Sequence, residues 1–279
     1  MTFWFRGADG QQLAADVFGP DVGTPVILIG GMGQTRHSWR RVAERLASGG
    51  RRAITLDIRG HGESGRAPDG DYSYPRQIAD MEAVAASIGR SVVLAGNSLG
   101  GKISLAAAGT HGGDVIAALA LVDAVPHSNP AGIQALGRSL PFPADGFSSP
   151  QEAAEQLATA RGLPVEADAG DRLVRNMRQD SAGRWHWHWD LEYRNPRHRI
   201  GLGAGSDLLD DLARNVTVPA MLAWCELSEV VDARGVAALK AAIPHLEVEV
   251  IPGARHLIVG DQNDVFADAL VRFLDRNRL

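Results

Sequence analysis

The chain has 279 residues, of which 45% are hydrophobic and 22% are charged, an ordinary balance for a globular protein. Its formal net charge of −5 gives little electrostatic support for binding nucleic acid, so no nucleic-acid partner is expected. No stretch reaches the roughly 18 apolar residues that a membrane-spanning helix needs, so no membrane association is expected either.

The N-terminal stretch MTFWFRGADG lacks the basic region and long apolar run of a secretory signal peptide. Cys225 is the only cysteine, which excludes an intrachain disulfide and a thiolate metal cluster. We therefore expect a cytoplasmic protein.

The runs TFWF at 2–5 and QLAADVF at 12–18 are β-prone and flank the turn ADG, which predicts a hairpin at the edge of a sheet. Short apolar runs then alternate with helical patterns. The apolar runs lie at 26–29, 53–57, 91–96, 115–123, 220–225 and 246–251, and the helical patterns at 38–47, 74–88, 101–109, 232–242 and from about 264. This alternation predicts an α/β fold, a doubly wound and mostly parallel sheet covered by helices on both faces.

Residues 126–210 break this rhythm, because they are rich in Pro, Gly and polar residues. Helical patterns return near 150–160 and 169–180, and a structureless loop of this length is improbable in a compact domain. We predict an inserted, mostly helical cap over 126–210, on a core formed by residues 1–125 and 211–279.

The cap contains the stretch RWHWHWD at residues 184–190. In an extended segment His186, His188 and Asp190 would share one face, which is how a hydrolytic metal site often begins. Leu191 stands where metallohydrolases with this pattern have a further histidine, and no other His or Asp is spaced to complete a zinc shell. No metal is expected, although metal-dependent hydrolysis remains a rival reading.

The other face of that segment would carry three tryptophans. These indoles either anchor the cap to the core or line a pocket with an apolar portion of the substrate against them. On the second reading, Trp187 and Trp189 are candidate substrate-binding residues.

The strongest motif is Gly96-Asn97-Ser98-Leu99-Gly100, which fits G-x-S-x-G. The bare pattern is weak, and a glycine-rich turn with a capping serine is the alternative. However, the motif directly follows an apolar strand and opens a helix. This strand–turn–helix context predicts that Ser98 is a nucleophile on a strained turn.

A serine nucleophile needs a base and donors for the oxyanion. Of nine histidines, only His61 and His256 lie at the carboxyl end of a predicted strand, and His61 belongs to a loop that it more plausibly shapes. We therefore predict His256 as the base. The amides of Leu99, at the start of a helix, and Met32, in the turn after residues 26–29, are the expected oxyanion donors.

That turn reads GGMGQ, and its Gly31 is a further candidate for contact with the substrate. A glycine-rich turn can also bind phosphate. Neither a dinucleotide-binding fingerprint nor a phosphate-binding loop with lysine is present, so no cofactor is expected.

Together these features resemble the α/β-hydrolase superfamily over essentially the whole chain. The matching motifs are GGMG at 30–33, DIRGHGES at 57–64, GNSLGG at 96–101 and GARH at 253–256. The detail is most similar to the cap-bearing branch of esterases, lactonases and cofactor-free haloperoxidases. Gly30 is a departure, because many members have a histidine there, and it puts the second oxyanion donor in question.

The resemblance implies an acid between the serine and the histidine in chain order. Glu229, with Asp232 close behind, follows the strand at 220–225 and is slightly favoured. Asp123, at the end of an earlier strand, is the alternative that some relatives use. The sequence leaves this choice open.

The implied activity is hydrolysis of a small or medium ester or lactone through an acyl-enzyme on Ser98. C–C bond hydrolysis and cofactor-free haloperoxidase or perhydrolase chemistry on the same triad are the alternatives, and a non-catalytic ligand receptor is a rival of another class. The expected partner is the small-molecule substrate. The oligomeric state is left open, and a homodimer is compatible with the sequence.

Overall fold

The computed structural model describes residues 2–195, 206–257 and 263–279. Eight strands form one sheet, in which only the β1–β2 and β2–β4 pairs are antiparallel. In spatial order they are β1 (Phe3–Arg6), β2 (Gln12–Phe18), β4 (Ala53–Leu56), β3 (Val26–Ile29), β5 (Val92–Asn97), β6 (Ile116–Val122), β9 (Ala220–Cys225) and β10 (Glu247–Ile251). The predicted parallel sheet with a hairpin at one edge is confirmed.

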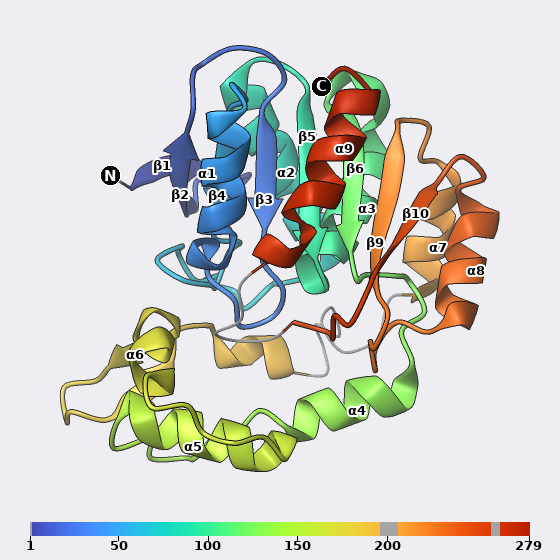
Figure 1. Cartoon of the computed structure of the whole chain (residues 1–279). Helices are drawn as coiled ribbons and strands as arrows, with labels where there is room; N and C mark the ends of the chain where they lie inside the picture. Colours follow the sequence, from blue (N-terminus) through green and yellow to red (C-terminus); the bar gives the residue numbers. More distant parts are fainter. Residues whose placement is uncertain (1, 196–205, 258–262) are drawn as a thin grey trace.

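Helices cover both faces of this sheet (Figure 1). One face carries α1 (Arg40–Ser48) and α9 (Ala267–Arg276); the other carries α2 (Tyr74–Ile88), α3 (Leu99–His111), α7 (Ser206–Arg214) and α8 (Ala233–Ala242). Every residue of β3 and β4 is buried, which explains why these strands are continuous apolar runs rather than alternating ones. Among the described helices, none has the length and hydropathy needed to span a membrane.

After β6, residues 126–195 leave the sheet and form a separate layer beyond the carboxyl ends of its parallel strands (Figure 1). We call these residues the insert. It contains α4 (Pro130–Arg138), α5 (Pro150–Arg161), α6 (Ala169–Leu173) and an antiparallel hairpin of β7 (Met177–Gln179) and β8 (Trp185–Trp187). The described part of the chain also contains short 3-10 helices. These are η1 (Arg36–Trp39), η2 (Gly112–Asp114), η3 (Val174–Asn176), η4 (Leu191–Arg194) and η5 (Asp264–Phe266).

The insert has a hydrophobic cluster of its own. Phe147, Ala153, Ala154, Leu157, Leu173, Met177, Trp187 and Trp189 are all buried in it. Trp187 and Trp189 stack with ring centroids 5.1 Å apart, and Met32 packs against this cluster from the core. The two indoles therefore hold the insert together internally, rather than anchoring it to the sheet.

The predicted boundary between cap and core at residues 210 and 211 falls inside α7. Leu209 and Ala213 on this helix are fully buried in the core cluster that also contains the apolar face of α3. Packing at these two residues thus joins α7 to the core side of the molecule.

Candidate active site

Ser98 lies between the end of β5 and the start of α3, with φ 49° and ψ −113°. Residues other than glycine rarely adopt this backbone conformation. The surrounding structure must therefore hold Ser98 in it. A Cβ atom on Gly96 would lie 2.3 Å from the Gly100 carbonyl oxygen, and one on Gly100 would lie 2.5 Å from the Gly30 carbonyl oxygen. The two glycines of the motif are what permit this close packing of strand, turn and helix.

Hydrogen bonds connect Ser98 to a histidine and an aspartate. Ser98 Oγ lies 3.1 Å from His256 Nε2, and His256 Nδ1 lies 2.7 Å from Asp123 Oδ2. His256 follows β10 and is 5% exposed, while Asp123 is fully buried. His256, which is distant from both in the chain, thus joins Ser98 and Asp123 in one hydrogen-bonded series.

Asp123 directly follows β6 and has a φ of 47°. Its carboxylate accepts two hydrogen bonds besides that of His256, from the Cys225 amide at 3.1 Å and from Ser228 Oγ at 2.7 Å. These donors fix both carboxylate oxygens and so set the direction in which Asp123 meets the imidazole ring. Sequence reasoning did not identify Ser228, and no motif marks it.

Glu229, the slightly favoured acid, is not bonded to His256. Its carboxylate forms an ion pair with Arg255, and both side chains are about half exposed. Asp232 caps α8, where Oδ1 accepts the Gly235 amide at 2.9 Å. The preference for Glu229 does not match this geometry. The turn after β9 directs the Glu229 side chain to the surface. Asp123 instead follows β6, which pairs directly with β5, the strand that precedes Ser98.

The predicted oxyanion donors lie on either side of Ser98. Leu99 is the first residue of α3, where backbone amides have no acceptor within the helix and the helix dipole favours negative charge. Met32 lies in the turn at residues 31–34, which we call the oxyanion turn. A Cβ atom on Gly31 would lie 3.1 Å from Ser98 Cβ, so this turn touches the serine. No described residue accepts a hydrogen bond from the Met32 or Leu99 amide.

The side chain of Gln34 lies beside Gly30, the position at which many members of the superfamily have a histidine. Its Oε1 accepts the Gly31 amide at 3.0 Å, and a Cβ atom on Gly30 would lie 3.0 Å from Gln34 Cβ. Gln34 Nε2 in turn lies 3.4 Å from Oδ1 of the fully buried Asn263. The side chain of Gln34 thus occupies the space beside Gly30 and braces the turn. Its position within GGMGQ was the only signal in the sequence.

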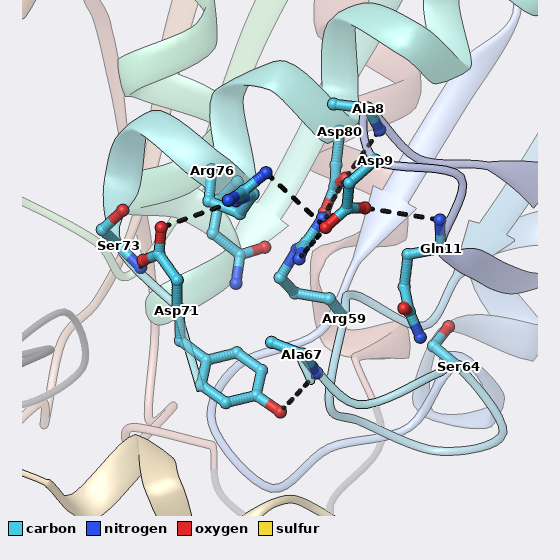
Figure 2. Close-up of polar contacts among 12 residues, drawn as sticks. Ala8, Asp9, Gln11, Arg59, Ser64, Ala67, Asp71, Ser73, Arg76 and Asp80 are labelled. Carbon is cyan, nitrogen blue, oxygen red and sulfur yellow. Dashed lines mark hydrogen bonds and ion pairs between the residues drawn. The ribbon is translucent and has the colours of Figure 1, made fainter. Parts of the chain in front are cut away.

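The loop DIRGHGES is fixed at its base by Arg59, which is completely buried. Its guanidinium contacts Asp80 through two hydrogen bonds of 2.6 Å and Asp9 through bonds of 3.1 and 3.2 Å (Figure 2). Burial by itself would lower the pKa of Arg59, but these carboxylates together outweigh it and raise the pKa above its usual value. Two residues further along, His61 Nε2 accepts the Gly33 amide at 3.2 Å, so His61 contacts the oxyanion turn.

The three polar residues of RWHWHWD have separate partners. His186 is partly exposed and lies 2.9 Å from Asp180; His188 is buried against the oxyanion turn. Asp190 Oδ2 accepts the Tyr72 hydroxyl at 2.7 Å. In residues 2–195, 206–257 and 263–279, no three or more His, Cys, Asp or Glu side chains are grouped so as to hold a metal ion.

A cavity of about 450 Å³ borders His256, between the insert and the loops that follow β9 and β10. It is lined by Gly132, Ala135, Leu136, Ser139, Ala160, Arg161, Gly162, Leu163, Glu229, Val230, Arg255 and His256. His256 is the member of the series Ser98–His256–Asp123 that lines it. The other predicted site residues outside its lining are Gly31, Met32, Leu99, Trp187 and Trp189. The two indoles are buried inside the insert, with Trp187 Nε1 donating to the Pro141 carbonyl at 2.8 Å.

Comparison with known proteins agrees with this architecture. An N-formylmaleamate deformylase of Pseudomonas putida is 29% identical over 254 residues, which cover 91% of this chain and 89% of that protein. An sn-1-specific diacylglycerol lipase of Danio rerio is 25% identical over 96% of this chain and 84% of its own.

The crystal structure of an α/β hydrolase from Novosphingobium aromaticivorans superposes with a TM-score of 0.79 at 24% identity, over 99% of this chain and 98% of that one. The family model for the alpha/beta hydrolase fold matches residues 24–262. The chain therefore belongs to the α/β-hydrolase fold family.

Proposed function

We propose that this hydrolase cleaves a small or medium carboxylic ester or lactone through an acyl-enzyme on Ser98. The observation that carries the proposal is the hydrogen-bonded series Ser98–His256–Asp123, with a serine held at φ 49°. In it, His256 Nε2 accepts the Ser98 proton as Oγ attacks the carbonyl carbon. Asp123 orients the ring and stabilises the imidazolium that forms.

The negative charge that develops on the carbonyl oxygen is stabilised by the amides of Met32 and Leu99. His256 then returns the proton to the leaving alkoxide, and the alcohol departs. In the second half of the reaction, His256 takes a proton from water as the water oxygen attacks the acyl carbon. The bond from that carbon to Ser98 Oγ then breaks, His256 returns the proton to Oγ, and the carboxylic acid leaves. In a lactone, alcohol and acid remain in one molecule.

The insert acts as a cap over this site, and the cavity beside His256 holds the substrate. Its volume of about 450 Å³ suits a small or medium molecule, and it contains both aliphatic side chains and arginines. The lining supports a substrate with an apolar portion and a polar end. Trp187 and Trp189 shape this layer from within the insert and contribute indirectly, through its packing.

A fluorophosphonate probe tests the proposal directly. We expect one covalent adduct, located on Ser98 by peptide mass spectrometry, and none in a Ser98→Ala variant of the same fold. Absence of an adduct in the native protein would contradict serine catalysis.

A substrate panel then separates the chemistries. It should contain p-nitrophenyl esters of increasing chain length, lactones, an N-formyl amide and a C–C hydrolase substrate, with halide and peroxide oxidation assayed in parallel. We expect the highest kcat/KM among the esters or lactones. A preference for any other class would retain Ser98 and change the assigned reaction.

A further inference from the structure

Gly33, the third residue of the oxyanion turn, is held from two sides. Its amide donates to His61 Nε2 at 3.2 Å. Its carbonyl oxygen accepts from His188 Nε2 at 3.0 Å and from Asn176 Nδ2 at 3.2 Å. His61 belongs to the core, whereas Asn176 and His188 come from the insert, on either side of the β7–β8 hairpin. All three side chains are buried.

The hydrogen bonds fix opposite tautomers of the two histidines. The Gly62 amide donates to His188 Nδ1 at 2.5 Å, so the proton of this ring is on Nε2, which faces the Gly33 carbonyl. His61 accepts at Nε2, so its proton is on Nδ1, 3.5 Å from the Arg59 carbonyl. Burial lowers the pKa of His61 to about 4 and that of His188 to about 3, so both rings are neutral near pH 7.

The hydrogen bonds at Gly33 restrain the turn that carries the Met32 amide. The oxyanion turn is closed by the Gln34 amide donating to the Gly31 carbonyl at 3.0 Å, with Met32 and Gly33 at its centre and Gly33 at φ 79°. Because glycine has no Cβ, its backbone dihedrals are little restricted. A turn with glycine at its centre can therefore reorient its peptide groups at low cost. The bonds at Gly33 immobilise both peptide groups that flank it, next to the Met32 donor.

The segment that follows the hairpin is hydrogen-bonded to the loop DIRGHGES of the core. The Asp190 amide donates to the Gly60 carbonyl at 2.8 Å, and the Tyr193 hydroxyl donates to the Arg59 carbonyl at 2.8 Å. Arg59 is held by the carboxylates drawn in Figure 2. The insert, the loop DIRGHGES and the oxyanion turn therefore form one connected network.

We infer that Asn176 and His188 are positioning residues through which the seated insert holds the oxyanion turn in its catalytic orientation. This inference rests on the proposed function, because it assigns the turn to transition-state stabilisation. It means that the insert does more than cover the substrate. Without Asn176 and His188, the Gly33 carbonyl would lose both of its donors from the insert, and the turn that carries the Met32 amide would lose this support.

The test compares Asn176→Ala, His188→Leu and the conservative His188→Gln, which keeps a donor for Gly33 and an acceptor for Gly62. His186→Leu is the matched control, because His186 lies in the same hairpin, is partly exposed and does not touch Gly33. Near-ultraviolet circular dichroism and the unfolding midpoint check that each variant is folded. Asn176→Ala keeps the inference testable if His188→Leu does not fold.

Each variant is assayed with the best ester of the native enzyme and with a trifluoromethyl ketone, whose adduct with Ser98 carries an oxyanion. Losing one oxyanion donor costs about 10²- to 10³-fold in kcat, so disturbing its support should cost about 10- to 100-fold. We expect that loss in kcat for Asn176→Ala and His188→Leu, an equal loss in ketone affinity, and KM nearly unchanged. His188→Gln should recover most of the activity, and His186→Leu should match the native enzyme.

Native kcat and ketone affinity in both folded variants would overturn the inference. So would a loss confined to KM, or an equal loss in His186→Leu, which would assign the effect to hairpin stability. These outcomes differ from failure of the proposed function, in which the native protein itself gives no fluorophosphonate adduct on Ser98.

Discussion

Two carboxylates illustrate what a single residue contributes at this site. Asp123 accepts hydrogen bonds from His256, Ser228 and the Cys225 amide inside the protein. Glu229 lies near the surface, paired with Arg255. A carboxylate orients an imidazole effectively only where its own position is fixed, and the buried network supplies this for Asp123 alone.

Replacing each acid by its amide separates their roles. Asp123→Asn should lower kcat by about 10³- to 10⁴-fold, because the amide cannot stabilise the imidazolium and favours the wrong tautomer. Glu229→Gln should change kcat by less than about threefold, since Glu229 is paired with Arg255 and not with His256; as a residue of the cavity lining it can affect KM. Steady-state kinetics on one ester at several pH values measure both. A larger loss for Glu229→Gln than for Asp123→Asn would contradict the assignment of the acid.

Among the helices, α3 has an unusual feature one turn after Ser98. Lys102 is only 5% exposed, although its side chain ends in an ammonium group. Desolvation lowers the pKa of this ammonium group to about 8. A cation that is largely removed from water destabilises the folded state, because water solvates it better than the protein interior does.

Lys102→Met should therefore raise the free energy of unfolding by about 2 to 3 kcal/mol at pH 7. The penalty of the lysine is complete below its folded pKa and disappears as pH rises from about 8 to 10.5, so the gain should shrink over this range. Urea denaturation at pH 7 and pH 10 measures the effect. Lys240→Met is the control, because Lys240 bonds to the Leu246 carbonyl, and it should not stabilise. Destabilisation by Lys102→Met would refute this account.

At the scale of the whole molecule, core and insert meet at buried neutral histidines. His61 and His188 have folded pKa values of about 4 and about 3, against 6.5 for an unperturbed histidine. At pH values between these folded pKa values and 6.5, the two histidines bind more protons in the unfolded chain than in the folded one. The free energy of unfolding therefore falls as pH is lowered below about 6.5.

His188→Gln isolates this effect from other titrating groups. At pH 4 the native protein should have lost about 3 kcal/mol more, relative to pH 7, than the His188→Gln variant, because the glutamine does not titrate. Denaturation curves at one-unit pH intervals provide the measurement, with the partly exposed His186 replaced by Gln as control. Parallel stability profiles for native protein and His188→Gln would show that His188 is not buried and neutral.

Much of the fold follows from local patterns in the sequence. The apolar runs became strands, the stretch at 74–88 became α2 with the predicted bounds, and the turn ADG joins the edge hairpin. These elements depend on side-chain periodicity and turn chemistry, which are properties of neighbouring residues. The motif around Ser98 could be read in the same way, because strand, glycine turn and helix are contiguous.

Contacts between distant segments were decided only by the tertiary structure. Sequence alone could not rank Asp123 above Glu229, since both follow predicted strands and only strand order and turn direction bring one to His256. The alternation in RWHWHWD correctly suggested two faces, but not that the indoles pack within the insert and that His188 reaches Gly33. Periodicity assigns a side chain to a face, whereas its partner depends on how the whole chain packs.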